Sequence, residues 1–170
     1  MTSRIWLAAL AALTLAVAAA PAAAQTREGD PVVDYAAKDA AMNAAIAEAQ
    51  RTLPVFWRRQ FGEARDGSEM VKVALPSDNG GREHIWVIEV QRSAAGYRGI
   101  LDNEPRGLPG LSRGSEVTFT ADMISDWAYG HKGRLWGGYT LRVMLPDLAP
   151  DDAARLRAYL SDTPLEPSAR

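Results

Sequence analysis

The chain has 170 residues, a formal net charge of −2 and no cysteine. The acidic balance excludes a typical nucleic-acid binder, because affinity for phosphate backbones comes from clustered Lys and Arg. The lack of cysteine excludes disulfides, thiol nucleophiles, thiolate metal ligands and a lipidated cysteine behind a leader. A chain of this length suits one domain that is stabilised by its core alone.

The first residues have the pattern of an export signal. Arg4 supplies a positive start, residues 5–20 form an uncharged apolar run, and small alanines lead up to Ala24. A retained membrane anchor is the weaker interpretation, because the run is short, rich in alanine and interrupted by Pro21. We therefore expect residues 1–24 to be cleaved near Ala24. The protein would then act in the periplasm or outside the cell, with no membrane association.

A helical region follows a polar linker over residues 25–37. From Ala36 to Leu53, apolar side chains recur at helical spacing, which predicts an amphipathic helix. Pro54 is expected to break this helix, because proline lacks the backbone N–H and clashes with the preceding turn. A second short helix with bulky side chains should then end at Gly62. The paired basic residues Arg58 and Arg59 are interpreted as its solvated face.

Strand patterns dominate the rest of the chain. Alternating apolar and polar residues predict strands over residues 70–75, 116–120 and 139–145, the last with the cleanest alternation. Residues 84–91 are apolar on both faces, which indicates a central strand, and residues 97–101 form its short partner. Pro150 and the acidic residues after it begin a last helix that reaches Leu160, because such residues suit a helix N-terminus.

The order of these elements predicts an α+β fold. N-terminal helices would pack on a curved antiparallel sheet, within a single domain over residues 38–146. Residues 147–170 would form a C-terminal helix and a frayed tail. The glycines at nearly every turn leave open whether the sheet curls into a small open barrel.

Several segments together resemble a known family. They are MNAAIAEAQRTLPVFWRRQF in the helical region, HIWVIEV in the central strand, residues 99–105, residues 124–127 and residues 137–140. Between about Met42 and Leu145 the chain resembles the uncharacterised bacterial domain-of-unknown-function family 2314. The resemblance implies one domain and carries no reaction.

The segment from Ile124 to Arg142 gathers four aromatic rings beside an Asp and a His. Three of these rings and one from the central strand would form either an exposed platform for a glycan or peptide, or part of the core: Trp86, Trp127, Tyr129 and Trp136. Asp126 would act either as an acid with a raised pKa beside Trp127 or, as we favour, as a cap for backbone N–H groups. Together with two polar residues of a Pro/Gly loop, the segment supplies a candidate binding surface: Asn103, Glu104, Asp126, Trp127, Tyr129 and His131.

Other chemistry finds little support in the sequence. Ser112 lies in a G-x-S-x-G pattern, but the pattern lacks the strand before it and the helix after it that a nucleophile elbow requires. Two histidines without close spacing argue against a metal site. A glycine-rich loop that leads into a helix is missing, so we expect no nucleotide cofactor. We predict no catalytic residue, no metal and no cofactor.

The leading hypothesis is therefore an exported, non-enzymatic binding module whose partner is a protein or an envelope polymer. One alternative is a small envelope hydrolase that uses Glu104 or Asp126 as acid–base, assisted by His84 or His131. The other alternative is a purely structural accessory domain. The oligomeric state, the ligand and the pathway stay open.

Overall fold

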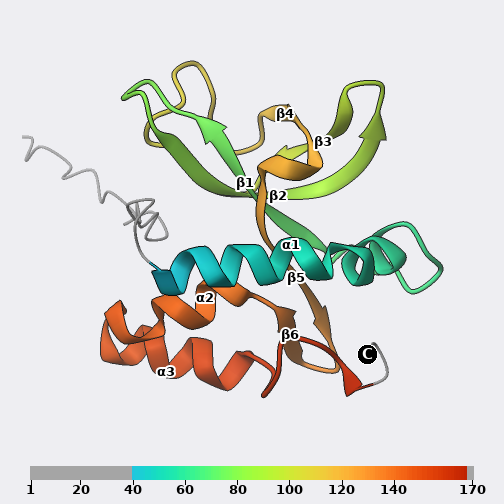
Figure 1. The fold of residues 1–170 in the computed structure, drawn as a ribbon, viewed down its shortest axis with the longest axis vertical. Coiled ribbons are helices and arrows are strands. Elements are labelled where there is room, and N and C mark those ends of the chain that lie inside the picture. The colour runs from blue at the N-terminus through green and yellow to red at the C-terminus, as the bar shows by residue number, and fades with distance from the viewer. Residues whose placement is uncertain (1–39, 168–170) are drawn as a thin grey trace, which may run out of the picture.

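The computed structural model describes residues 40–167, so the predicted leader and linker lie outside the described residues (Figure 1). The predicted α+β fold is confirmed, with one long helix, an antiparallel sheet and a C-terminal helix. The elements are α1 (Ala40–Gln60), β1 (Met70–Pro76), β2 (Arg82–Ser93), β3 (Gly96–Leu101), β4 (Glu116–Phe119), η1 (Ala121–Met123), β5 (Ile124–His131), β6 (Arg134–Gly137), α2 (Tyr139–Met144), η2 (Leu145–Asp147) and α3 (Pro150–Tyr159). None of the helices between residues 40 and 167 is long and apolar enough to span a membrane.

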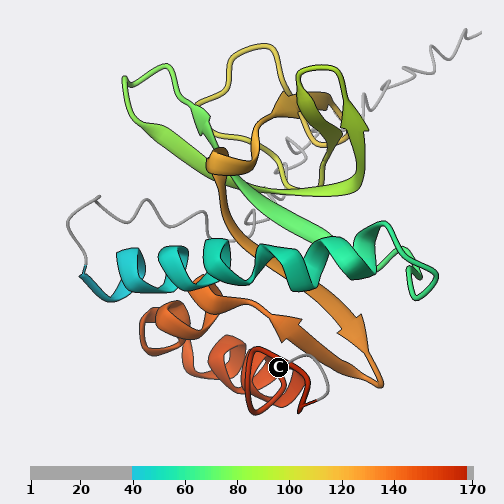
Figure 2. The same ribbon diagram turned by 45° about the vertical axis from the view of Figure 1, so that its right-hand side comes forward.

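The six strands form one open sheet in the order β4-β3-β2-β1-β5-β6. Every neighbouring pair is antiparallel. Figures 1 and 2 show the β2–β4 part bending over at one end of the molecule, while β5 and β6 lie beside the helices at the other end. The sheet is thus curved and open.

Curvature in β2 has a local cause. The pairing with β3 shifts register between Ile88 and Gln91, and Glu89 has a φ of 54° inside this bulge. A bulge bends its strand and increases the twist of the sheet. Gly99 on β3 lets the strands approach, because an added Cβ would lie 2.6 Å from Cγ1 of Val87.

Two apolar clusters cover the sheet. The larger joins α1 to all of the central strands and contains Phe56, Val71, Val87 and Trp127, each fully buried. The smaller lies between the sheet and the C-terminal helices, around Leu135 and neighbouring leucines. Both faces of β1 and β5 are covered, so most of their residues are buried, including the charged Lys72 and Asp126 that pair across the two strands.

The prediction that Pro54 breaks the first helix is wrong, because α1 continues through it to Gln60. Proline removes the bond to the Gln50 carbonyl. The packing of this helix compensates, since Leu53 and Phe56 are buried on the sheet. The Trp127 indole N–H also donates to the Ala49 carbonyl at 3.0 Å.

The prediction of a strand over Tyr139–Leu145 is also wrong, because this segment forms α2 and the start of η2. Gly137 and Gly138 have φ angles of 76° and 61°, which turn the chain out of β6. An added Cβ at Gly137 would lie 2.2 Å from the Trp127 carbonyl oxygen, so glycine is required there. The alternation of this segment instead belongs to a single short helix.

Candidate functional site

Asp126 lies in β5 and is fully buried. One carboxylate oxygen accepts hydrogen bonds from the backbone N–H groups of Trp127 at 2.8 Å and Tyr139 at 3.0 Å. The other accepts from the backbone N–H and the hydroxyl of Thr140, at 2.8 and 2.6 Å. The favoured capping role of Asp126 is therefore confirmed: its carboxylate holds the first turn of α2.

Lys72 closes this buried polar cluster from β1. Its ammonium donates to the Thr140 hydroxyl at 3.1 Å and lies 5.1 Å from the centre of the Trp86 ring. Burial raises the pKa of Asp126 and lowers the pKa of Lys72, and the charge of each group opposes the shift of the other. Lys72 as a whole residue is only 8% exposed. The cluster is thus a closed piece of the core.

The aromatic rings of β5 lie in the core as well. Trp127 is 0% and Tyr129 3% exposed, and their rings stack with centroids 5.8 Å apart. The Trp127 indole also donates to the Thr52 hydroxyl at 3.1 Å, which fastens α1 to β5. These two rings therefore do not form the exposed platform considered from the sequence, because helices cover the face of β5 that carries them.

Asn103 and Glu104 belong to the loop between β3 and β4, at the other end of the strand order from β6. Glu104 accepts a hydrogen bond from the backbone N–H of Arg113 at 2.9 Å. Glu83 ties the same loop to β2 by accepting from the N–H of Gly107 at 2.7 Å. The six candidate residues therefore do not form one surface.

The hydrolase candidates also have separate partners. His84 Nδ1 lies 2.8 Å from the Ser125 hydroxyl, and His131 Nδ1 lies 2.7 Å from Glu166. Ser112 is tied to its own turn, where its N–H donates to the Ser115 hydroxyl at 3.0 Å. Among residues 40–167, moreover, no group of three or more His, Cys, Asp or Glu side chains could hold a metal ion.

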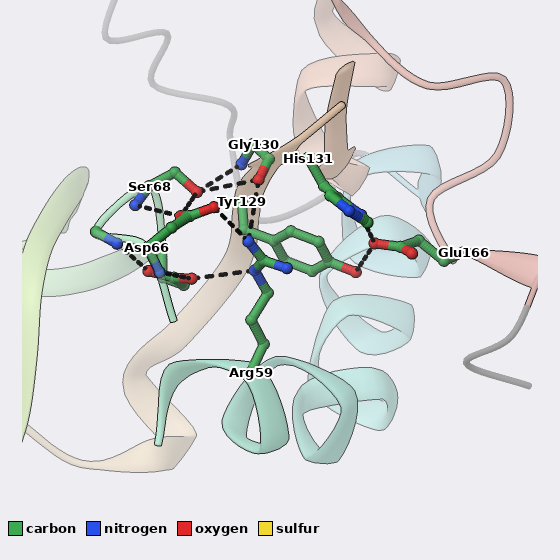
Figure 3. Close-up of polar contacts among 9 residues, drawn as sticks. Arg59, Asp66, Ser68, Tyr129, Gly130, His131 and Glu166 are labelled. Carbon is green, nitrogen blue, oxygen red and sulfur yellow. Dashed lines mark hydrogen bonds and ion pairs between the residues drawn. The ribbon is translucent and has the colours of Figure 1, made fainter. Parts of the chain in front are cut away.

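A different polar network surrounds the end of β5, where Tyr129 and His131 lie (Figure 3). Both donate to the same oxygen of the Glu166 carboxylate, Tyr129 through its hydroxyl at 3.1 Å and His131 through Nδ1 at 2.7 Å. We call these three residues the carboxylate site. Its His131 and Glu166 side chains are 32% and 20% exposed, so solvent reaches it.

Arg59 supports this site from α1. Its guanidinium lies 4.5 Å from the centre of the Tyr129 ring and donates to the Gly130 carbonyl at 3.3 Å. Two carboxylates fix it in place, Glu69 at 3.0 Å and Asp66 at 2.6 Å. Figure 3 shows the guanidinium against the ring, with Glu166 on the opposite side of the site. Arg59 thus fixes the position of the Tyr129 ring.

The protonation of Tyr129 suits a hydrogen-bond donor. Burial raises the pKa of its phenol, and the charge of Glu166 and the hydrogen bond to it raise that pKa further. The phenol therefore keeps its proton at neutral pH. A neutral hydroxyl and an imidazole N–H that converge on one oxygen make a binding site for a carboxylate.

Sequence reasoning included Tyr129 and His131 among the candidates but missed Arg59 and Glu166. Arg59 was assigned to a solvated helix face, although it lies three residues after the buried Phe56 and so shares part of its face. Glu166 lies in the segment predicted to be frayed. Nothing local in the sequence pairs it with β5.

Aromatic rings do gather at the surface elsewhere. Trp57 and Phe61 at the end of α1 stack with centroids 5.3 Å apart, and Trp57 stacks on Tyr97 of β3 at 4.5 Å. Phe61 is 38% exposed, and the Arg92 guanidinium lies 4.4 Å from its ring centre. We call these four residues the aromatic ridge, a second candidate surface.

Comparison with known proteins gives a family and two relatives. The model of a family described as "Uncharacterized protein conserved in bacteria (DUF2314)" matches residues 39–160. The chain is 29% identical over 133 residues to "Putative ankyrin repeat protein NMB1133/NMB1171" of Neisseria meningitidis serogroup B, covering 73% of this chain and 53% of that protein, so it spans about half of that relative. It is 29% identical over 120 residues to the uncharacterized protein YegJ of Escherichia coli K12, covering 71% and 77%. No solved structure matches the chain significantly.

Proposed function

Because the chain belongs to the bacterial DUF2314 family, as its resemblance predicted, we propose a role for a member of a family without an assigned activity. The proposed role is that of an exported, non-enzymatic binding module of the cell envelope. Its contact site is the carboxylate site at the end of β5. The partner is a protein or envelope polymer that presents a carboxylate.

One observation carries this proposal. The hydroxyl of Tyr129 and the imidazole of His131 converge on a single carboxylate oxygen at a place that solvent reaches. Charge-assisted hydrogen bonds of this kind are among the stronger polar contacts in proteins. Because both donors come from one strand and Arg59 braces the Tyr129 ring, the donors themselves need little rearrangement to bind a carboxylate that replaces Glu166.

The geometry favours binding over catalysis. One of the two acid–base candidates, Asp126, is fully buried and already accepts four hydrogen bonds. A general acid or base must reach the proton that it transfers. A hydrolase that used Asp126 would need it to leave the first turn of α2, which would expose unsatisfied backbone groups. The other acid–base candidate, Glu104, is exposed and far along the strand order from His131.

Export is proposed on the sequence alone. The charged start, the apolar run over residues 5–20 and the alanines before Gln25 support a cleaved leader. Fractionation of the producing bacterium, with N-terminal sequencing of the product, tests this part. A start near Gln25 in the periplasmic fraction supports export, and an intact Met1 in the cytoplasm overturns it.

Partner capture tests the binding site. The full chain, tagged at its C-terminus and produced with its own leader, is used to capture partners from envelope extract. We expect the double variant Tyr129→Phe, His131→Gln to recover at least about tenfold less partner, since each lost hydrogen bond to a charged group costs about 1.5–3 kcal/mol. Both substitutions keep the side-chain volume nearly constant, so the fold should survive.

Two further variants show whether a loss of capture is specific to the carboxylate site. Tyr159→Phe alters an exposed tyrosine and should leave capture unchanged. Phe61→Ala removes the exposed ring of the aromatic ridge. Capture that persists in the double variant rejects the carboxylate site, and loss in Phe61→Ala alone would move the contact surface to the ridge.

A further inference from the structure

We infer that the segment Leu160–Glu166 occupies the carboxylate site and the edge of β6 in the way that the partner does. The partner is therefore an extended acidic peptide segment that adds to the edge of β6. We call residues 160–166 the tail strap. This inference rests on the proposed function and deepens it, because it names the class of partner and the way access is regulated.

The tail strap pairs with β6 through its backbone. Leu160 forms a parallel bridge with Leu135, and the N–H of Ser161 donates to the Leu135 carbonyl at 3.0 Å. Further along, the N–H of Gly137 donates to the Pro164 carbonyl at 2.8 Å. Added strands on sheet edges are a common way to bind peptides, because the backbone bonds supply affinity without regard to sequence.

Two side chains of the tail strap add specificity. Leu165 packs against the main core, and Glu166 reaches the carboxylate site directly after it. The strap therefore presents a backbone acceptor, an apolar side chain and a carboxylate in consecutive residues. A partner segment would need the same order: an apolar residue followed by an acidic one.

The two ends of the tail strap are held differently. Ser161 is 3% exposed and accepts from the Arg142 guanidinium at 2.9 Å through its carbonyl. From Asp162 onward the residues are exposed or half-buried, and Asp162 pairs with Arg134 at 2.9 Å on the surface. Ser161 is thus the fixed point. If the part that ends in Glu166 leaves, the Gly137 N–H and the place of Leu165 become open to a partner segment that supplies the same groups.

The boundary of the family supports this division. The family model matches residues 39–160, which include β6, Tyr129 and His131, and ends where the tail strap begins. The edge of β6 and the donors Tyr129 and His131 therefore lie within the residues that the family model matches. The occupant in this chain does not.

Tethering makes the tail strap a strong competitor. A short tether raises the effective concentration of a segment near its site to the order of mM. A free peptide must therefore compete with the strap, and weakening the strap should strengthen binding of the peptide. Removing the charge of Glu166 weakens the strap and leaves both donors of the carboxylate site unchanged.

The experiment measures binding of a fluorescently labelled peptide, LSDTPLEP, to the full chain by anisotropy. We expect Glu166→Gln to bind this peptide at least about tenfold more tightly than the wild type does. Glu63→Gln, an exposed change beyond α1, serves as the matched control and should bind like the wild type. Adding Tyr129→Phe to Glu166→Gln should weaken binding again, and a peptide with Gln in place of its Glu should bind weakly to every variant.

Equal affinity of the wild type and Glu166→Gln, or the absence of binding to both, overturns the inference. Equal affinity for the Glu and Gln peptides also overturns it. These results are separable from failure of the proposed function. Capture from envelope extract without peptide binding supports the contact site and rejects the inference that the tail strap imitates the partner. Peptide binding without any capture supports that inference and rejects the role in the cell envelope.

Discussion

Two carboxylates lie at the two ends of β5, and the difference between them separates support from recognition. Asp126 has no exposed surface and accepts three of its four hydrogen bonds from the first turn of α2, two of them from backbone N–H groups. Glu166 comes from the tail strap, is 20% exposed, and accepts only from two side chains. Buried backbone donors cannot find water when the acceptor leaves, whereas the imidazole of His131, whose side chain is 32% exposed, can.

The comparison teaches that chemical type alone does not identify a functional acid. Both groups lie beside the same strand and close to aromatic rings. Only Glu166 is reached by solvent and held by side chains alone, so it is the one that a ligand carboxylate can replace. Variants at the two ends of β5 should therefore differ in how much they change the free energy of unfolding and in whether they change binding.

The largest effect is expected from Asp126→Ala. It leaves the N–H groups of Tyr139 and Thr140 without their acceptor and Lys72 without its counter-charge. Losing one partner of a buried charged cluster typically costs about 3–5 kcal/mol. Urea denaturation should show this loss in the free energy of unfolding. Glu63→Ala, an exposed change, should stay within about 0.5 kcal/mol of the wild type; similar values for both would refute the supporting role of Asp126.

A middle-sized effect is expected from Trp127→Phe. The change removes an indole N–H that donates to Ala49 and Thr52 and trims a fully buried ring. We expect a loss of about 2–3 kcal/mol in the free energy of unfolding. Trp136→Phe is the matched control, since its buried indole nitrogen has no acceptor in the structure. Equal free energies of unfolding for the two variants would contradict the role of the Trp127 indole in joining α1 to β5.

The smallest effect is expected from Glu166→Gln, at about 1 kcal/mol near neutral pH. Its pH dependence is the sharper test. The raised pKa of Tyr129 means that its contribution to stability is fully present below about pH 10, the ordinary value for tyrosine, and is lost as pH rises through the folded-state pKa. Glu166 causes part of that rise, so the stability gap between wild type and variant should shrink above pH 10. A gap that widens there would contradict the pairing of Tyr129 with Glu166.

Local patterns predicted much of the fold. The helical stripe before Pro54 and the strands from residue 70 to 101 follow from residue periodicity, and the final helix follows from the proline and acidic residues at its start. The capping role of Asp126 was also predictable, since Asp commonly caps backbone groups. Whether the rings of β5 are exposed stayed open, because periodicity does not reveal which face of a strand a distant helix covers.

The failures share one cause, which is long-range contact. Packing on β5 and the sheet overrides the break expected at Pro54, and the two glycines before Tyr139 override its strand-like alternation. The carboxylate site is built from α1, β5 and the tail strap, so no single window of sequence contains it. Family membership was predictable, because the quoted segments lie within the matched residues.

The place of β1 in the sheet has a consequence for how the chain is made. β1 pairs with β2 at once through a short turn, but its other neighbour, β5, arrives only after β2, β3 and β4 have been synthesised. Closing so long a loop is slow, and until then one edge of β1 offers unpaired backbone groups. During biogenesis this temporarily open edge is the place where a misfolded or aggregated product would start, and the arrival of Ile124–His131 is the step that ends the risk.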